Sequence, residues 1–289
     1  MDTGQPFEEQ LMQEIINLAL TEDRVRDDVT TNSLKDYDNQ VTAAVIAKEN
    51  GIISGTGVFI NTFITVDPLV SINVFKGDGS EVKKGDIVLE IKGMESSILK
   101  AERTALNFLQ RLSGIATLTK KFVDKLKPYH TTLLDTRKTT PGMRYLEKKA
   151  VRDGGGTNHR LNLEDMAMVK DNHIEMAGTI SNAVKKIREK FPGKKIEVEV
   201  KNLTELDEAL SLEVDMIMLD NFNIGMLKEA VQTVKQSQYR HRAKLEISGN
   251  VDLENIAEKA AVGVDFISVG ALTHSFTSLD LSLKIRGNS

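Results

Sequence analysis

The chain contains no cysteine among its 289 residues. Disulfide bonds, thiolate catalysis and zinc sites with sulfur ligands are therefore excluded. No apolar run approaches the roughly 20 residues that a membrane-spanning helix needs. Residues 1–13 are polar and acidic, without the basic start and apolar centre of a signal peptide. We therefore expect a cytoplasmic protein that has no membrane partner.

A strong net charge is missing as well. The formal charge is −4, from 38 basic and 42 acidic residues, which is too mild to indicate a nucleic acid partner. An anionic substrate would therefore have to be met by positive charge that is concentrated locally. The length of 289 residues favours two domains with a large buried core.

The first part of the chain predicts a β-rich domain that ends near residue 115. Residues 7–20 place apolar side chains at helical spacing, and residues 41–47, 51–57 and 71–75 are β-type runs separated by turn residues. Residues 96–120 are then typical of one long helix or of two joined helices.

Residues 77–91 resemble the hammerhead hairpins of biotinyl and lipoyl carrier domains. A carrier would need a lysine on a tight, exposed turn soon after this hairpin. The chain instead runs into the helix predicted at residues 96–120. We therefore interpret residues 77–91 as scaffold.

From about residue 130 onward, short apolar strands alternate with amphipathic helices. The predicted strands are residues 132–135, 166–169, 196–200, 216–220, 244–248 and 266–269, and the predicted helices include residues 180–191, 203–211, 225–236 and 252–261. Repeated β–α units imply a parallel sheet, and six or more favour an α/β barrel. A doubly wound sheet is the alternative, but it would carry a Gly-rich phosphate turn after its first strand, and residues 136–142 do not match that pattern.

Polar residues follow the predicted strands, where parallel barrels collect their active groups. A single polar residue at the end of a strand is usually only exposed to solvent, but here the basic and the acidic residues follow different strands. The early strands and the loop before the second one supply basic residues, namely Arg137, Lys138, His159, Arg160 and Lys170. The later strands supply the acidic Glu199 and Asp220, and then the small residues Ser248, Gly249, Asn250, Gly270 and Ala271.

This segregation predicts a pocket with two halves. The basic half suits a small ligand with several carboxylates. The acidic half suits a hard cation such as Mg²⁺. The backbone N–H groups of the small residues suit a phosphate.

Four segments carry a family resemblance: residues 102–107 (Glu-Arg-Thr-Ala-Leu-Asn), 135–142 (Asp-Thr-Arg-Lys-Thr-Thr-Pro-Gly), 155–160 (Gly-Gly-Thr-Asn-His-Arg) and 170–173 (Lys-Asp-Asn-His). Residues 197–199, 219–221 and 246–250 extend the match in the same order. Together they closely resemble nicotinate-nucleotide pyrophosphorylase (carboxylating), also called quinolinate phosphoribosyltransferase. The resemblance covers nearly the whole chain, and several long motifs in one order argue against chance agreement.

The resemblance implies an α/β fold with an N-terminal α/β sandwich domain over residues 1–115. An incomplete parallel α/β barrel, like that of the type II phosphoribosyltransferases, is expected over residues 116–274, and the tail 275–289 is expected to pack back on the first domain. The implied reaction joins quinolinate to phosphoribosyl pyrophosphate with Mg²⁺, giving nicotinate mononucleotide, pyrophosphate and CO₂ in NAD biosynthesis. The implied assembly is a homodimer or a higher assembly of dimers, with Arg103 donated across the interface.

The resemblance also implies roles, which we carry over position by position. Two carboxylates of quinolinate are expected to contact Arg137, His159, Arg160 and Lys170, with Arg103 of the partner subunit. Lys138, Glu199 and Asp220 are the expected catalytic residues, and the latter two are expected to hold Mg²⁺ directly or through water. The 5′-phosphate is expected against Ser248, Gly249, Asn250, Gly270 and Ala271, and Thr136 completes the substrate-binding set.

Three other interpretations remain open. A paralogue on the same fold would act on another substrate, although only a dicarboxylate needs so many cations. A Schiff-base aldolase would use Lys170, whose basic surroundings would help to depress its pKa. A non-catalytic anion-binding protein would bind without turnover and would leave Glu199 and Asp220 without an obvious purpose.

Overall fold

The computed structural model describes residues 4–237 and 243–286. The chain divides into two compact units. Unit 1 contains residues 1–120, 139–155 and 273–289, and unit 2 contains residues 121–138 and 156–272. None of the described helices is long and apolar enough to cross a membrane.

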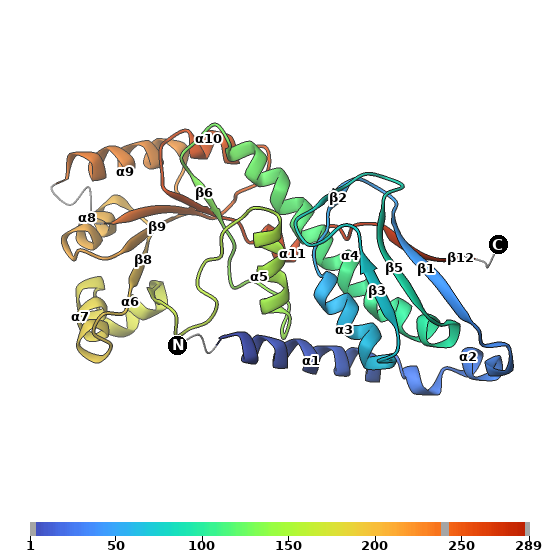
Figure 1. The fold of residues 1–289 in the computed structure, drawn as a ribbon. Helices are drawn as coiled ribbons and strands as arrows, with labels where there is room; N and C mark the ends of the chain where they lie inside the picture. Colours follow the sequence, from blue (N-terminus) through green and yellow to red (C-terminus); the bar gives the residue numbers. More distant parts are fainter. Residues whose placement is uncertain (1–3, 238–242, 287–289) are drawn as a thin grey trace. The chain divides into compact units, whose positions relative to one another are not determined.

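Unit 1 contains a four-stranded antiparallel sheet in the order β12-β1-β5-β3 (Figure 1). These strands are β1 (Gln40–Ala47), β3 (Ser71–Val74), β5 (Ile87–Met94) and β12 (Leu281–Arg286). A second pair joins β2 (Gly51–Ile52) to β4 (Glu81–Val82). The helices are α1 (Gly4–Glu22), α2 (Val29–Ser33), α3 (Thr56–Val66), α5 (Arg144–Asp153) and the first part of α4 (Glu95–Leu126), with short 3-10 turns at Val25–Asp27 and Lys35–Tyr37.

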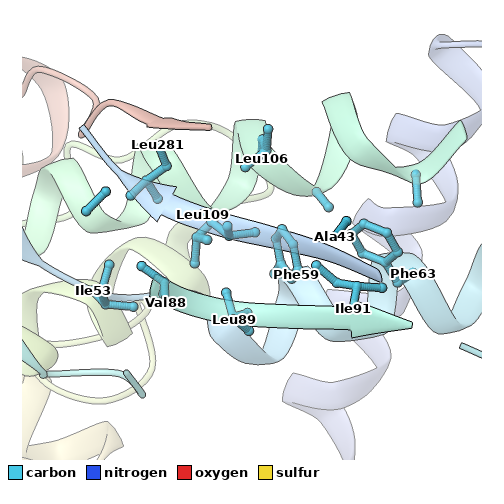
Figure 2. Close-up of a cluster of buried hydrophobic side chains, with 14 of the residues drawn as sticks. Ala43, Ile53, Phe59, Phe63, Val88, Leu89, Ile91, Leu106, Leu109 and Leu281 are labelled. Atoms are coloured by element: carbon cyan, nitrogen blue, oxygen red, sulfur yellow. The ribbon is translucent and has the colours of Figure 1, made fainter. Parts of the chain in front are cut away.

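The core of unit 1 lies between this sheet and the helices α3 and α4. Figure 2 shows Phe59 and Phe63 of α3 with Leu106 and Leu109 of α4 among the buried side chains around the strands. The two phenylalanine rings lie 5.0 Å apart in a tilted arrangement, which is favourable for aromatic pairs. Buried apolar area of this kind is the main stabilising contribution of the unit.

The prediction of a β-type run at residues 51–57 was wrong beyond Ile52, because α3 begins at Thr56. Gly55 has a φ of 97°, a left-handed conformation that glycine adopts without cost and that turns the chain out of the strand. The backbone N–H of Thr56 then donates to Asp78 at 2.9 Å. The segment is rich in β-branched and aromatic residues, which favour strands by propensity, but its tertiary packing produces a helix.

The scaffold interpretation of residues 77–91 agrees with the structure. Strand β5 pairs with both β1 and β3, so it lies inside the sheet. It leads directly into α4, a single helix of 32 residues. This helix continues past Lys120 into unit 2.

Unit 2 contains a six-stranded, entirely parallel sheet in the order β6-β11-β10-β9-β8-β7. The strands are β6 (Thr132–Leu134), β7 (Ala167–Val169), β8 (Ile196–Val200), β9 (Met216–Asp220), β10 (Lys244–Ser248) and β11 (Phe266–Ser268). An isolated parallel bridge joins Leu134 to Thr157 beyond β6. Strands β6 and β7 form the two ends of the sheet, so it is open and the prediction of an incomplete α/β barrel is confirmed.

Helices connect these strands (Figure 1). The connecting helices are α6 (Asp171–Ala177), α7 (Ile180–Lys190), α8 (Leu203–Ser211), α9 (Ile224–Gln236) and α10 (Ile256–Ala260), and α11 (Ala271–His274) follows the strand β11. Successive strand residues face opposite sides of a sheet, and one side is apolar, with Val198, Ile217 and Ile247 buried there. That side suits the connecting helices, while the charged strand residues share the other side.

The two units divide the chain differently from the expected boundaries at residues 115 and 274. Residues 139–155, expected in the barrel, belong to unit 1, because Lys149 of α5 forms ion pairs with Asp78 and Asp153 and Arg111 bonds Glu147 at 2.7 Å. Within the tail 275–289, β12 pairs with β1, and residues 287–289 lie outside the described residues.

Candidate functional site

The candidate site lies at the carboxyl edge of the parallel sheet in unit 2. Asp220 at the end of β9 is the register partner of Ser248 at the end of β10. Glu199 of β8 pairs with Met218, two residues before Asp220 on the same side. Lys170 follows β7 directly, and its ammonium lies 2.9 Å from the Glu199 carboxylate. The structure therefore brings four predicted site residues together from four neighbouring strands.

The Lys170–Glu199 ion pair is unequally exposed. The lysine side chain is 43% exposed, whereas the glutamate is 12% exposed. Nearby, Lys201 forms an exposed ion pair with Asp171 at 3.0 Å, and His173 accepts the Lys170 backbone N–H at 3.1 Å. These contacts order the loop after β7, so Lys201 and His173 support Lys170 in this structure.

Two arginines supply the concentrated positive charge. Arg137 follows β6 and Arg160 follows the bridge at Thr157, and both are half-buried. Burial and the neighbouring Arg137 charge lower the pKa of Arg160. One guanidinium nitrogen of Arg160 donates to the Met166 carbonyl at 2.9 Å, which leaves most of its donors for other partners.

The loop that carries Arg160 is held by a buried carboxylate. Asp135, fully buried at the end of β6, accepts the backbone N–H of His159 at 2.8 Å and the Asn158 amide at 2.6 Å. The Nε2 of the His159 ring lies 3.0 Å from Glu197 and 3.3 Å from Glu246. Burial opposes protonation of His159 and the two carboxylates raise its pKa, while the Arg160 backbone N–H that donates to Nδ1 at 2.8 Å favours the neutral ring.

The small residues after β10 form a strained loop. Gly249 has a φ of 90° and Asn250 a φ of 46°, both in the left-handed region. The Lys259 ammonium of α10 donates to the carbonyls of Gly249 (2.9 Å) and Asn250 (2.7 Å). Peptide carbonyls and N–H groups point in opposite directions, so this contact turns the following N–H groups away from Lys259.

The remaining predicted residues occupy several places. Thr136 accepts the Lys138 backbone N–H at 3.1 Å, which orders the turn after β6, and Lys138 is exposed. Gly270 lies between β11 and α11, and Ala271 is the first residue of α11. Arg103 lies exposed on α4 and is the one predicted site residue that belongs to unit 1.

Sequence reasoning assigned no role to Glu197, Glu246, Asp135 or Lys259. A signal existed for the two glutamates, because each lies inside a short strand whose neighbouring residues are apolar: Ile-Glu-Val-Glu-Val and Lys-Leu-Glu-Ile-Ser. A charged residue inside such a strand either faces solvent or is buried with a partner. Only the structure shows that both are buried.

Comparisons with known proteins agree with this geometry. Residues 28–113 match the family described as quinolinate phosphoribosyl transferase, N-terminal domain, and residues 115–284 match the C-terminal domain of the same family. A probable nicotinate-nucleotide pyrophosphorylase (carboxylating) of Synechocystis sp. is 43% identical over 270 residues, which cover 93% of this chain and 90% of that relative. One from Archaeoglobus fulgidus is 42% identical, covering 89% of this chain and 98% of that protein.

A solved structure shows the same fold. The nicotinate-nucleotide pyrophosphorylase from Francisella tularensis has a TM-score of 0.90 and 41% sequence identity, covering 96% of both chains. Because two domain families and several relatives match nearly the whole chain, it belongs to the quinolinate phosphoribosyltransferase family and is an enzyme of NAD biosynthesis.

Proposed function

We propose that the carboxyl edge of the unit 2 sheet is the place where this quinolinate phosphoribosyltransferase carries out its reaction. Quinolinate and phosphoribosyl pyrophosphate would give nicotinate mononucleotide, pyrophosphate and CO₂. The observation that carries the proposal is the segregation of charge at one sheet edge. Arg137 and Lys170 follow the two end strands of the open sheet, β6 and β7, and Arg160 bonds Met166 just before β7, whereas Glu199 and Asp220 lie on the inner strands β8 and β9.

The basic side suits the two carboxylates of quinolinate. Arginine binds a carboxylate through two parallel hydrogen bonds, and lysine adds a compact charge. Like charges at Arg137 and Arg160 lower the pKa of the latter, so a dianionic ligand would relieve their repulsion. Lys170 already contacts Glu199 at 2.9 Å, so it is placed to bridge the ligand and the acidic side.

The acidic side fits a Mg²⁺ ion that accompanies the pyrophosphate. Glu199 and Asp220 offer carboxylate oxygens, which hard cations prefer, and Lys170 neutralises only one of the two. A bound Mg²⁺ would supply positive charge against the phosphate oxygens. The exposed Lys138 adds a second positive charge for the leaving pyrophosphate.

The chemistry needs positioning more than covalent participation by the protein. The quinolinate nitrogen attacks C1 of the ribose while the pyrophosphate leaves, and Glu199 and Asp220 stabilise the positive charge that builds on the sugar ring. The ring nitrogen then carries the charge, so the pyridinium itself accepts the electrons released when the adjacent carboxylate leaves as CO₂. Holding both substrates in line supplies several kcal/mol of barrier lowering.

The phosphate end of the substrate is proposed to bind against residues 248–250, Gly270 and Ala271. Support comes from the Lys259 contacts, which turn backbone N–H groups of residues 250 and 251 away from that ammonium. Thr136 is proposed to support the same substrate by ordering the turn that carries Lys138.

A coupled assay tests the reaction and its place together. Wild-type protein should release CO₂ and pyrophosphate in equal amounts, and chelation of Mg²⁺ should abolish both. Arg137→Ala should lower kcat/KM for quinolinate by about 100-fold, because losing one charged partner of a carboxylate costs about 3 kcal/mol. Arg188→Ala is the matched control, because its guanidinium bonds the carbonyls of Leu212 and Glu213 before β9. Wild-type kinetics in Arg137→Ala would reject this site.

We also propose a homodimer, or an assembly of dimers, in which Arg103 of the partner subunit completes each site. Inactive Arg103→Ala and Arg137→Ala protomers should then restore activity when they are mixed. Each mixed dimer has one intact site, so a random mixture should recover about a quarter of the wild-type rate. No recovery after verified subunit exchange would place Arg103 in its own subunit's site or outside it.

The predicted cytoplasmic location stays a prediction, and fractionation of the source cells tests it.

The paralogue interpretation makes a separate prediction, since such a protein would prefer another aromatic acid. Competition between quinolinate and related pyridine carboxylates in the same assay decides between the two.

A further inference from the structure

Beneath the proposed quinolinate pocket lie two carboxylates that the reaction does not use. Glu197 of β8 and Glu246 of β10 are both fully buried. Glu197 is two residues before Glu199 on the same side of the sheet, and Glu246 is two residues before Ser248. Among the described residues, none makes a hydrogen bond to their oxygens, and the His159 ring lies beside both carboxylates.

Such an arrangement opposes folding. Each charge loses its hydration on burial, and a partner restores only part of that loss. The register neighbours of the two carboxylates, Met216 and Met218, are apolar, so an apolar packing of this layer is available to the fold. Costly buried groups at a substrate pocket point to a role in that pocket.

The two carboxylates hold His159 in one orientation. Its Nε2 lies 3.0 Å from Glu197 and 3.3 Å from Glu246. On the other side of the ring, Nδ1 accepts the backbone N–H of Arg160 at 2.8 Å. A ring nitrogen that accepts a hydrogen bond carries no proton, so the Arg160 N–H favours the neutral ring whose proton is on Nε2, the nitrogen beside the two carboxylates.

His159 therefore connects the buried carboxylates to the backbone of Arg160. The Arg160 side chain is anchored separately, where its guanidinium donates to the Met166 carbonyl at 2.9 Å. With its backbone and its head group both held, the guanidinium has little freedom. A small displacement of a substrate-positioning group is costly, because the ligand contacts depend on its exact direction.

We propose that Glu197 and Glu246 are positioning residues for quinolinate, acting through His159 to place Arg160. The inference rests on the proposed function of this pocket. It explains why the His159 ring lies beside the buried carboxylates, and it adds a positioning role to the expected contact of His159 with the ligand.

A buried metal ion is the competing explanation for the same cluster. The candidate ligand atoms of His159, Glu197 and Glu246 lie within 4.8 Å of one another. A metal on Nε2 would leave the ring proton on Nδ1, where the Arg160 N–H donates. The Arg160 hydrogen bond to Nδ1 therefore argues against a metal on Nε2.

Steady-state kinetics of Glu246→Gln test the proposal. The substitution preserves size and removes one carboxylate. We expect the KM for quinolinate to rise on the order of tenfold, while the KM for phosphoribosyl pyrophosphate stays near the wild-type value. Glu208→Gln is the matched control, because Glu208 accepts two hydrogen bonds from Ser181 in the helical layer, and it should change neither constant.

Other results would overturn the proposal. An unchanged or lower KM for quinolinate would mean that Glu246 acts only as a counter-charge, since its removal makes the pocket more positive. A parallel rise of both KM values would indicate a general structural role. Stoichiometric metal in the purified enzyme, lost in Glu246→Gln, would assign the cluster to a metal.

A binding experiment separates this inference from the proposed function. Benzene-1,2-dicarboxylate has the two carboxylates of quinolinate but no ring nitrogen, so it binds without reacting. Calorimetry should show weaker binding to Glu246→Gln than to wild type. If wild type turns over quinolinate and both proteins bind this compound equally, only the positioning role fails. If wild type neither binds nor turns over, the proposed function fails.

Discussion

Substituting Gly249 with alanine should damage the phosphate end of the site through a specific clash. Two glycines of unit 2 have nearly the same positive φ, 90° at Gly249 and 92° at Gly263. Gly249 directly follows β10 at the carboxyl edge of the sheet, whereas Gly263 lies shortly before β11 at the opposite edge. Comparing alanine substitutions at these two glycines therefore separates the effect of backbone strain from the effect of lost or clashing contacts at the site.

The expected magnitudes follow from the space around each glycine. An L-residue in this region costs about 1–2 kcal/mol, and both variants bear that cost. A Cβ at Gly249 would also clash with the Asn221 side chain, with Cγ at 2.5 Å, adding about 1–3 kcal/mol. At Gly263 the nearest atom is the flexible Lys235 Nζ at 3.8 Å.

The clash with Asn221 should also affect the binding of the substrate. The Asn221 amide donates to the Asp220 carboxylate at 3.0 Å, and its backbone N–H donates to the Ser248 carbonyl at 3.0 Å. Gly249→Ala should therefore raise the KM for phosphoribosyl pyrophosphate on the order of tenfold or more. Gly263→Ala should lower the thermal midpoint and leave both KM values close to wild type. Equal kinetics in the two variants would refute the reasoning.

Two further substitutions test other parts of the structure. Gly114→Ala should lower the unfolding free energy by about 1–3 kcal/mol, because the added Cβ would clash with the Thr277 carbonyl. Gly57→Ala should raise the unfolding free energy by about 0.5–1 kcal/mol, because a Cβ at Gly57 would meet no other atom. Chemical denaturation measures both free energies, and a change of the same sign in the two variants would contradict the packing argument. Lys259→Met should raise the KM for phosphoribosyl pyrophosphate and spare quinolinate, because its ammonium holds two carbonyls of the proposed phosphate loop; an unchanged KM would reject that role.

The parallel sheet could be predicted from the sequence because its signals are local. Each central strand is a short apolar run, and residues 196–200, 216–220 and 244–248 were predicted with the bounds that the structure shows. Helix α3 could not be predicted in this way, since its local preference and its tertiary packing disagree. Residues 139–155 fall in unit 1 for a reason that local patterns do not contain, because the ion pairs of Lys149 join positions far apart in the chain.

The candidate site was predictable in outline but not in depth. Residues at strand ends were found because a parallel sheet places all its carboxyl ends at one edge, and the structure brings Lys170, Glu199, Asp220 and Ser248 there. The buried carboxylates Glu197 and Glu246 were not predicted, because only their contact with His159 indicates a role for them. Such contacts depend on register between distant strands, which local patterns do not specify.

The same layer makes the enzyme's stability depend on pH. Folding raises the pKa of Glu197 from 4.5 to about 7, because the carboxyl group is buried beside Glu246. The cluster therefore binds more protons when folded than when unfolded. Its contribution to stability is greatest at low pH and is lost progressively as pH rises from about 4.5 to about 7, by a few kcal/mol. Denaturation midpoints of the metal-free, ligand-free protein across this window should fall with pH, and Glu197→Gln should flatten the trend. A wild-type midpoint that does not change with pH would mean that the cluster exchanges no protons on unfolding. The cost of burying its carboxylates would then be offset by an interaction other than protonation.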